Sequence, residues 1–160
     1  MKRAQRIGLA ALAVALLAPA AWGADDKVPY WASLSAREAI MRAGPGQNYP
    51  AVWKYVRAGL PVKVVARHQH WRKIEEPDGT VGWMNGILLS EDRTAIVTRE
   101  VAPMRDAPDA AGRILWRAEP GVIGRISHCT TGWCEFDVLG RVGYIETARL
   151  WGVDAGETVN

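Results

Sequence analysis

The sequence has 160 residues, of which 49% are hydrophobic and 23% are charged, and its formal net charge is +3. Three of its 20 basic residues lie within the first 23 positions, so the rest of the chain carries 17 basic and 17 acidic residues. This neutral balance argues against a nucleic-acid partner, which an excess of positive charge would have favoured.

The first segment of the chain is typical of a secretory signal peptide. Basic residues precede an apolar run at 7–18, and small residues follow at Ala21 and Gly23. We expect a signal peptide at 1–23 with cleavage after Gly23, and a periplasmic or secreted protein. The apolar run is shorter than the about 20 residues that a spanning helix needs, and no lipoprotein cysteine lies near the cleavage site, so we expect no membrane insertion after cleavage.

The remaining sequence repeats itself. Six matches occur in the same order at separations of 61 to 63 residues, among them MR at 41–42 and 104–105, WRKI at 71–74 with WCEF at 133–136, and GTVGWM at 79–84 with GRVGYI at 140–145. Ordered matches at one separation indicate a duplicated unit. We therefore expect two copies, at 35–91 and 94–151, followed by a polar tail at 152–160.

Within the first copy, short apolar segments alternate with turns. The segments lie at 40–41, 60–66, 71–74, 81–84 and 87–89, and Gly, Pro, Asn, Asp or His residues separate them. Five short strands with frequent turns are typical of a small all-β barrel, and residues 87–90 are compatible with a short 3₁₀ turn. No window keeps a helical period. The predicted fold class is therefore all-β, with two tandem small barrels.

The order of the motifs resembles that of the bacterial SH3 domain. In the first copy it reads MRAGPG, VWKYVRAGLPVKVV, WRKI, GTVGWM and ILL. The second copy is less similar, because MRDAP lacks the Gly before Pro and GRVGYI has Tyr where Trp is usual. The resemblance covers nearly all of the chain after 1–23. It implies two SH3-like barrels in an exported bacterial protein, of a kind that often serves as a targeting or binding module attached to cell-wall enzymes.

The two cysteines, Cys129 and Cys134, lie in the run CTTGWC. In an exported chain, two strand-borne cysteines at this spacing favour a disulfide that closes a hairpin, over a free reactive thiol or a metal site. The first copy has Arg67 and Arg72 at the matching positions. His128 is a poor base for Cys129, because neighbours on a strand point to opposite faces.

The other residues with possible chemistry do not form a recognisable active site. His68 and His70 provide too few ligands for zinc, and they align with a hairpin turn of the second copy. The adjacent carboxylates Glu75 and Glu76 diverge instead of converging on one bond. We therefore expect no catalytic residues, no metal and no cofactor, and a protein that is not an enzyme.

Aromatic residues are the best candidates for binding. The predicted ligand-binding residues all lie in the first copy and are Tyr49, Trp53, Tyr55, Trp71 and Trp83. Trp71 and Trp83 also suit a role in the core. An exposed aromatic pair beside basic residues would suit a ligand with apolar or sugar faces and a carboxylate.

The orientation of Trp53 and Tyr55 depends on which side of their strand faces the core. Both residues alternate with Val52 and Val56, so they face outwards if the valines face inwards. Leu115 and Arg117 are then their counterparts in the second copy. The alternative, which stays open, is that Trp53 and Tyr55 pack against the second barrel.

A repeated arginine and its turn form the predicted structural motif, at Arg42, Gly44, Pro45, Arg105 and Pro108. A strand-end arginine can lie along an apolar neighbour and donate to turn carbonyls, and its recurrence in both copies favours this fold role over a ligand role. Pro fixes φ and Gly permits a positive φ, so AGPG suits a sharp exit from the strand.

These observations favour a non-catalytic binding module of the bacterial envelope. By resemblance its ligand is peptidoglycan, through the peptide or the glycan, in an aromatic groove on the first barrel. The alternative is a periplasmic protein partner, for which the chain would act as an interaction or scaffold protein, and a Cys-dependent cell-wall hydrolase is less favoured. We expect the first copy to be the binding half and the second to stabilise it.

Overall fold

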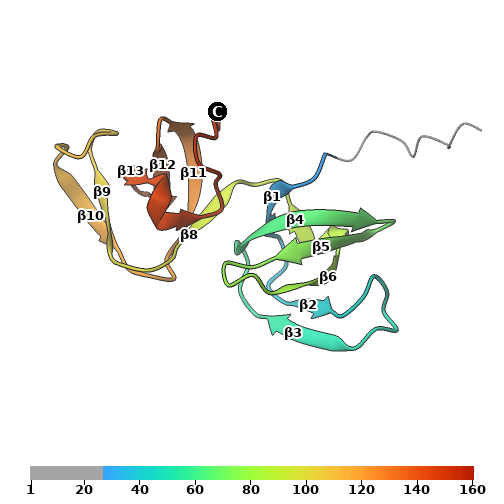
Figure 1. Cartoon of the computed structure of the whole chain (residues 1–160). Coiled ribbons are helices and arrows are strands. Elements are labelled where there is room, and N and C mark those ends of the chain that lie inside the picture. Colours follow the sequence, from blue (N-terminus) through green and yellow to red (C-terminus); the bar gives the residue numbers. More distant parts are fainter. Residues whose placement is uncertain (1–26) are drawn as a thin grey trace, which may run out of the picture.

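The computed structural model describes residues 27–160. The expected signal peptide at 1–23 lies outside this range. The described chain forms two seven-stranded antiparallel sheets, each curled into a small barrel (Figure 1). Barrel 1 contains β1 to β7 and barrel 2 contains β8 to β14, so the predicted all-β fold with two tandem barrels is confirmed.

The sheet of barrel 1 has the strand order β3-β2-β6-β5-β4-β1-β7. Its elements are β1 (Tyr30–Leu34), β2 (Ala39–Arg42), β3 (Ala51–Tyr55), β4 (Pro61–His68), β5 (Trp71–Glu75), β6 (Val81–Asn85), the 3₁₀ turn η1 (Gly86–Leu88) and β7 (Leu89–Ser90).

The sheet of barrel 2 has the equivalent order β10-β9-β13-β12-β11-β8-β14. Its elements are β8 (Thr94–Val97), β9 (Ala102–Arg105), β10 (Ile114–Ala118), β11 (Ile123–Thr130), β12 (Trp133–Val138), β13 (Arg141–Glu146), the 3₁₀ turn η2 (Thr147–Arg149) and β14 (Leu150–Trp151). No helix in the described part of the chain is long and apolar enough to cross a membrane.

Strand β1 lies before the expected start of the first copy at residue 35. It pairs with β4 through Trp31 opposite Lys63, and with β7 through Leu34 opposite Leu89. Its burial is almost continuous and does not alternate, because both neighbouring strands and the second barrel cover it. Its equivalent, β8, pairs with β11 and β14 in the same way.

The two cores divide their volume differently. In barrel 1, Val62 on β4 and Ile74 on β5 are both buried. The equivalent positions in barrel 2 are Gly124 and Phe136, and a Cβ atom at Gly124 would lie 2.7 Å from the Phe136 ring. A small residue on one strand therefore makes room for a large residue on the next.

The barrels contact each other directly. The rings of Trp31 in barrel 1 and Trp151 in barrel 2 pack edge to face, with centroids 4.9 Å apart. Lys63 Nζ lies 5.0 Å from the Trp31 ring centroid and 2.7 Å from Asp154 Oδ1. Thr94 Oγ1 also donates to the Gly59 carbonyl oxygen at 2.8 Å. Aromatic, ionic and backbone contacts together hold the barrels against each other.

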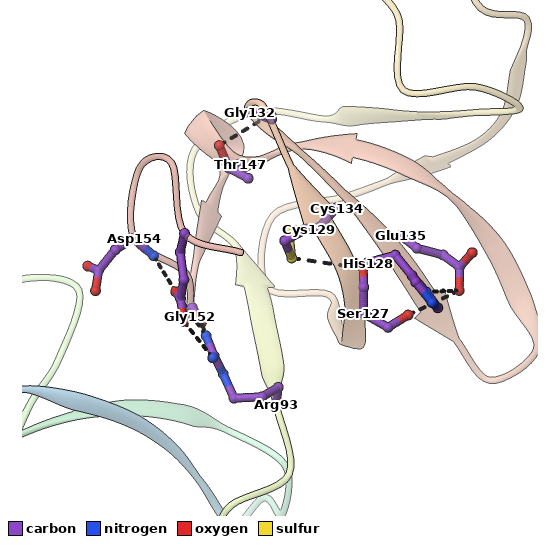
Figure 2. Close-up of a disulfide and its surroundings, with 11 residues drawn as sticks. Arg93, Ser127, His128, Cys129, Gly132, Cys134, Glu135, Thr147, Gly152 and Asp154 are labelled. Carbon is purple, nitrogen blue, oxygen red and sulfur yellow. Dashed lines mark hydrogen bonds and ion pairs between the residues drawn. A yellow bond between two sulfur atoms is a disulfide. The ribbon is translucent and has the colours of Figure 1, made fainter. Parts of the chain in front are cut away.

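Residues 152–160, expected as a polar tail, pack against barrel 2. Val153 and Val159 are each only 8% exposed, and the Cys129 N–H donates to the Val159 carbonyl. Arg93 donates to Glu157 Oε1 at 2.6 Å and to the Gly152 carbonyl at 3.0 Å (Figure 2). These contacts attach the final residues to the core and to the link between barrels.

Candidate functional site

A groove on barrel 1 surrounds Trp71. Two adjoining hollows, of about 380 and 460 Å³, share Gln47, Trp71, Asn85 and Ile87 in their linings. We call this surface the Trp71 groove; it is lined by Glu38, Ala39, Ile40, Arg42, Gln47, His70, Trp71, Arg72, Asn85, Gly86, Ile87 and Leu88.

Strand pairing and the η1 turn place the central residues of the groove. Trp71 begins β5 and lies opposite Asn85 at the end of β6. Directly opposed residues of antiparallel strands share a face of the sheet. For Trp71 and Asn85 this is the outer face, because Met84, which precedes Asn85 and points to the opposite face, is fully buried. Asn85 Oδ1 accepts the Ile87 N–H at 3.1 Å, which caps η1 and leaves Ile87 83% exposed at the rim.

The groove also carries positive charge. Arg72 Nη1 donates to the Gln69 carbonyl at 3.0 Å and to the Trp71 carbonyl at 3.1 Å, and Arg42 Nη1 donates to the Tyr49 carbonyl at 2.8 Å. Neither guanidinium forms an ion pair with a carboxylate among residues 27–160. A carbonyl leaves the guanidinium charge uncompensated, so both remain available to attract an acidic group.

The equivalent surface of barrel 2 is chemically different. Its hollow of about 300 Å³ has Glu146, Ala148 and Arg149 where barrel 1 has Asn85, Ile87 and Leu88. Arg149 lies 2.8 Å from Glu146 and 3.8 Å from Glu100. Arg149 on this surface of barrel 2 is therefore paired with carboxylates, whereas Arg42 and Arg72 in the Trp71 groove have no carboxylate partner among residues 27–160.

The structure separates the predicted aromatic residues. Trp71 lines the groove, whereas Trp83, on the same outer face, packs edge to face on His68 at 6.4 Å and is not in the lining. Tyr49 is 42% exposed and lies on the loop after β2. The predicted residues therefore do not form one continuous surface.

The turn at Gly44 and Pro45 is explained by Tyr49. A Cβ atom added at Gly44 would overlap the Tyr49 ring, and one at Gly46 would lie 2.5 Å from Asn48 Oδ1 and 3.3 Å from the ring. Neither glycine has a positive φ, so this turn does not use the left-handed backbone that glycine permits. The glycines are small so that the ring can lie against the turn.

The prediction that Trp53 and Tyr55 form an exposed pair is also wrong. Tyr55 lies opposite buried Ala39 and is 5% exposed in the core of its own barrel. Trp53, two residues before it, is on the same side but is 59% exposed, because β3 is the edge strand. Val52 and Val56 face outwards instead, at 51% and 71% exposed. Burial of Tyr55 in its own core equally excludes the alternative that the pair packs against barrel 2.

The second copy does have a counterpart of Trp53. Trp53 lies opposite Met41, and Trp116 lies opposite Met104, so these tryptophans are structurally equivalent. Leu115 was expected as the counterpart because the sequence matches made the β9–β10 loop one residue shorter than the β2–β3 loop. The two loops have the same length, so the counterpart is the next residue, Trp116. An exposed tryptophan on this edge is common to both barrels.

The repeated arginines make the same contact in both barrels. Arg42 Nη1 donates to the carbonyl of Tyr49, and Arg105 Nη1 donates to the carbonyl of Gly112, seven residues further on in each case. The loop that begins at Pro45 or Pro108 is thereby closed by the arginine that precedes it. This geometry agrees with a role in the fold.

The sequence matches one protein-family model at two places. The model of the bacterial SH3 domain matches residues 35–91 and again residues 98–152. The chain belongs to the bacterial SH3 domain family. No curated protein is significantly similar to it in sequence.

Two solved structures resemble this tandem bacterial SH3 chain weakly. NlpC2 from Trichomonas vaginalis has a TM-score of 0.34 at 15% identity, over 82% of this chain and 52% of that one. NlpC1 from Trichomonas vaginalis has a TM-score of 0.34 at 14% identity, over 80% and 47%. The chain spans about half the length of these two proteins.

The second SH3 domain contains the predicted disulfide. Cys129 on β11 and Cys134 on β12 are bonded across the hairpin, with Cα atoms 4.0 Å apart, and both are fully buried (Figure 2). His128 is exposed and lies 3.8 Å from Glu135. Within residues 27–160, no group of His, Cys, Asp and Glu side chains is arranged to hold a metal ion.

Tyr55 ties the first SH3 domain together through its hydroxyl. The group donates to Glu76 Oε1 at 2.7 Å and contacts Met41 Sδ at 3.5 Å. Burial, and secondly the hydrogen bond to the Glu76 carboxylate, raise the pKa of Tyr55 far above its ordinary value.

The raised pKa of Tyr55 predicts a loss of stability in alkali. The unfolded chain releases the tyrosine proton near pH 10, about the ordinary pKa, while the folded chain retains it. The contribution is therefore complete below about pH 10 and is lost as the pH rises further, with a slope of up to about 1.4 kcal/mol per pH unit. Urea unfolding above pH 10 should show a steeper decline for the wild type than for Tyr55→Phe; parallel declines would contradict this assignment.

The sequence prediction missed most of the lining of the groove. Gln47, Asn85 and Ile87 were not singled out, although an apolar Ile in a predicted surface turn after a strand was an available signal. Their proximity to Trp71 depends on the fold of a loop and a 3₁₀ turn, which the apolar pattern does not determine.

Proposed function

We propose that this protein is a non-catalytic module of the bacterial envelope that binds peptidoglycan, through its peptide or glycan, in the Trp71 groove. Bacterial SH3 domains are often cell-wall binding modules. The family and the disulfide both favour an extracytoplasmic location. The observation that carries the proposal is the contrast between this open groove and the ion-paired surface at the same place on barrel 2.

The chemistry of the groove suits a ligand with both apolar and polar parts. The Trp71 indole and Ile87 offer apolar surface to a sugar face or an alkyl side chain. Gln47 and Asn85 offer amide donors and acceptors, and Arg42 and Arg72 can each donate to a carboxylate. Peptidoglycan contains sugar rings, peptide bonds and free carboxylates.

A protein partner in the periplasm is the second candidate. The exposed side chain of Ile87 beside a tryptophan is also typical of a protein-binding surface. Cys-dependent hydrolysis is disfavoured by the disulfide, because both sulfurs are bonded and neither can act as a thiolate nucleophile.

The test is sedimentation of the protein with purified sacculi. Ile87→Asp places a carboxylate at the rim of the groove and should reduce binding at least tenfold, because it removes apolar contact and repels an acidic ligand. Since Ile87 is 83% exposed, the fold should be unaffected. The matched control is Ala148→Asp, which adds the same charge at the equivalent place on barrel 2 and should leave binding unchanged.

The outcomes separate the candidates. Equal binding by wild type and Ile87→Asp would exclude the groove as the site. If the wild type fails to sediment with sacculi, the cell-wall proposal is lost. In that case, cross-linking of wild type but not Ile87→Asp to a periplasmic protein would support the protein-partner alternative.

A further inference from the structure

Barrel 2 contains a small cavity at the position that a tyrosine ring fills in barrel 1. Tyr55 lies opposite Ala39, and Ala118 lies opposite Ala102 at the equivalent place. Both Tyr55 and Ala118 are buried. Replacement of a tyrosine by an alanine leaves a hollow of about 120 Å³ beside Ala118.

The cavity has an apolar floor and a polar mouth. Met104, Ala118, Val122 and Val138 supply the apolar surface. Trp116, 44% exposed, and two arginines, Arg117 and Arg141, complete the lining. The Arg141 guanidinium lies over the Trp116 ring, 5.4 Å from its centroid. We call this site the Ala118 pocket.

Barrel 2 has also lost the carboxylates that barrel 1 has near this position. Glu76, which accepts from Tyr55, is replaced by Val138. Glu38, which lies 3.0 Å from Lys54, is replaced by Val101, while Lys54 itself is replaced by Arg117. Both changes remove a negative charge, and the replacement of Lys54 by Arg117 keeps a positive one.

The two arginines of the pocket are therefore not neutralised. Neither Arg117 nor Arg141 has an ion pair with a carboxylate among the residues that the structure describes. Arg141 replaces Thr80 of barrel 1, so this cation is specific to the second copy. A guanidinium that stacks on an indole and keeps its donors exposed is well placed to bind a carboxylate.

We propose that the Ala118 pocket binds an apolar side chain whose own residue carries a free carboxylate. The side chain takes the place of the missing tyrosine ring, and the carboxylate meets the Arg141 guanidinium that lies over Trp116. An apolar cavity of about 150 Å³ accommodates benzene, so the smaller Ala118 pocket suits a branched aliphatic group such as that of leucine or valine. This site is independent of the Trp71 groove and of the cell-wall proposal.

The proposal is tested by titrating the full protein with N-acetyl-leucine while amide chemical shifts are followed by NMR. Shifts should concentrate around 116–118, 122 and 138–141. The matched probes are N-acetyl-leucinamide, which lacks the carboxylate, and N-acetylglycine, which lacks the apolar group; each should bind at least fivefold more weakly.

Two variants replace residues of the Ala118 pocket by their counterparts in barrel 1. Ala118→Tyr with Val138→Glu restores the tyrosine and its acceptor, fills the cavity, and should abolish the shifts. Arg141→Thr leaves the cavity empty and the fold unaltered, because residue 141 is exposed, and should weaken binding at least fivefold. Equal binding of the acid and the amide, persistence of the shifts in the filled variant, or no shifts in the wild type would each overturn the proposal.

A free apolar acid and the C-terminal residue of a peptide share this chemistry. A peptide ending in leucine should bind more tightly than N-acetyl-leucine if the natural ligand is a chain terminus, because it can also contact the edge strand β10. Equal affinities would indicate a free acid.

Discussion

Replacing Trp31 by alanine should lower the free energy of unfolding by about 3–5 kcal/mol, the usual cost of truncating a buried tryptophan. Trp31 is 8% exposed, packs on Trp151 of the other barrel and lies beneath the ammonium group of Lys63. The variant loses contacts in its own sheet and across the interface. Urea unfolding followed by circular dichroism measures the loss.

The same substitution should also separate the unfolding of the two barrels. When the interface is intact, each barrel stabilises the other, so we expect one transition in the wild type and two in Trp31→Ala. Trp31→Phe is the control, because it retains an aromatic ring and removes an indole N–H that is buried without an acceptor in the described structure. A single unshifted transition in Trp31→Ala would contradict the interface.

Replacing Phe136 by alanine should destabilise barrel 2 by about 3–5 kcal/mol. The ring is fully buried, and it occupies the space that Gly124 leaves free. Truncation therefore leaves a cavity next to a glycine, which has no side chain to fill it. Thermal or urea unfolding of the variant, compared with the wild type, tests the expectation.

A double-mutant cycle gives a sharper version of the same test. Gly124→Val alone should cost about 1–3 kcal/mol by overpacking, because its Cβ would meet the Phe136 ring at 2.7 Å and the Asp137 carbonyl oxygen at 2.8 Å. Phe136→Ile alone leaves a void. Together they reproduce the Val62 and Ile74 pair of barrel 1, so the double variant should be more stable than the sum of the single losses predicts. Strict additivity would show that the two positions do not share one space.

Much of the fold could be predicted because the duplication repeats its strand ends and turns. Met41 with Arg42, and Met104 with Arg105, mark the same strand twice, and the alternating pattern indicated β structure. Strand β1 was missed because only one of its residues, Ala32, is identical to its equivalent in β8, Ala95. The disulfide was predictable from the sequence alone, because the two cysteines lie five positions apart at the ends of a hairpin in a chain with an expected signal peptide.

The candidate site was harder to predict, because it depends on which side of an edge strand faces inwards. Tyr55 and Val56 are equally plausible as core residues from the pattern of alternation alone. The pairing of Tyr55 with buried Ala39 places Tyr55 in the core. Its hydroxyl can be buried because it donates a hydrogen bond to Glu76 Oε1. Trp71 was identified by its residue type, but its neighbours in the groove come from separate loops.

The unequal cores also bear on how the chain avoids exchanging strands while it folds. Tandem repeats of similar sequence are prone to misassembly between copies. If β4 entered barrel 2, Val62 would collide with Phe136, and if β11 entered barrel 1, Gly124 would leave a void beside Ile74. Complementary volumes thus disfavour the exchange of a single strand between the barrels, so divergence between the copies favours correct pairing within each hairpin.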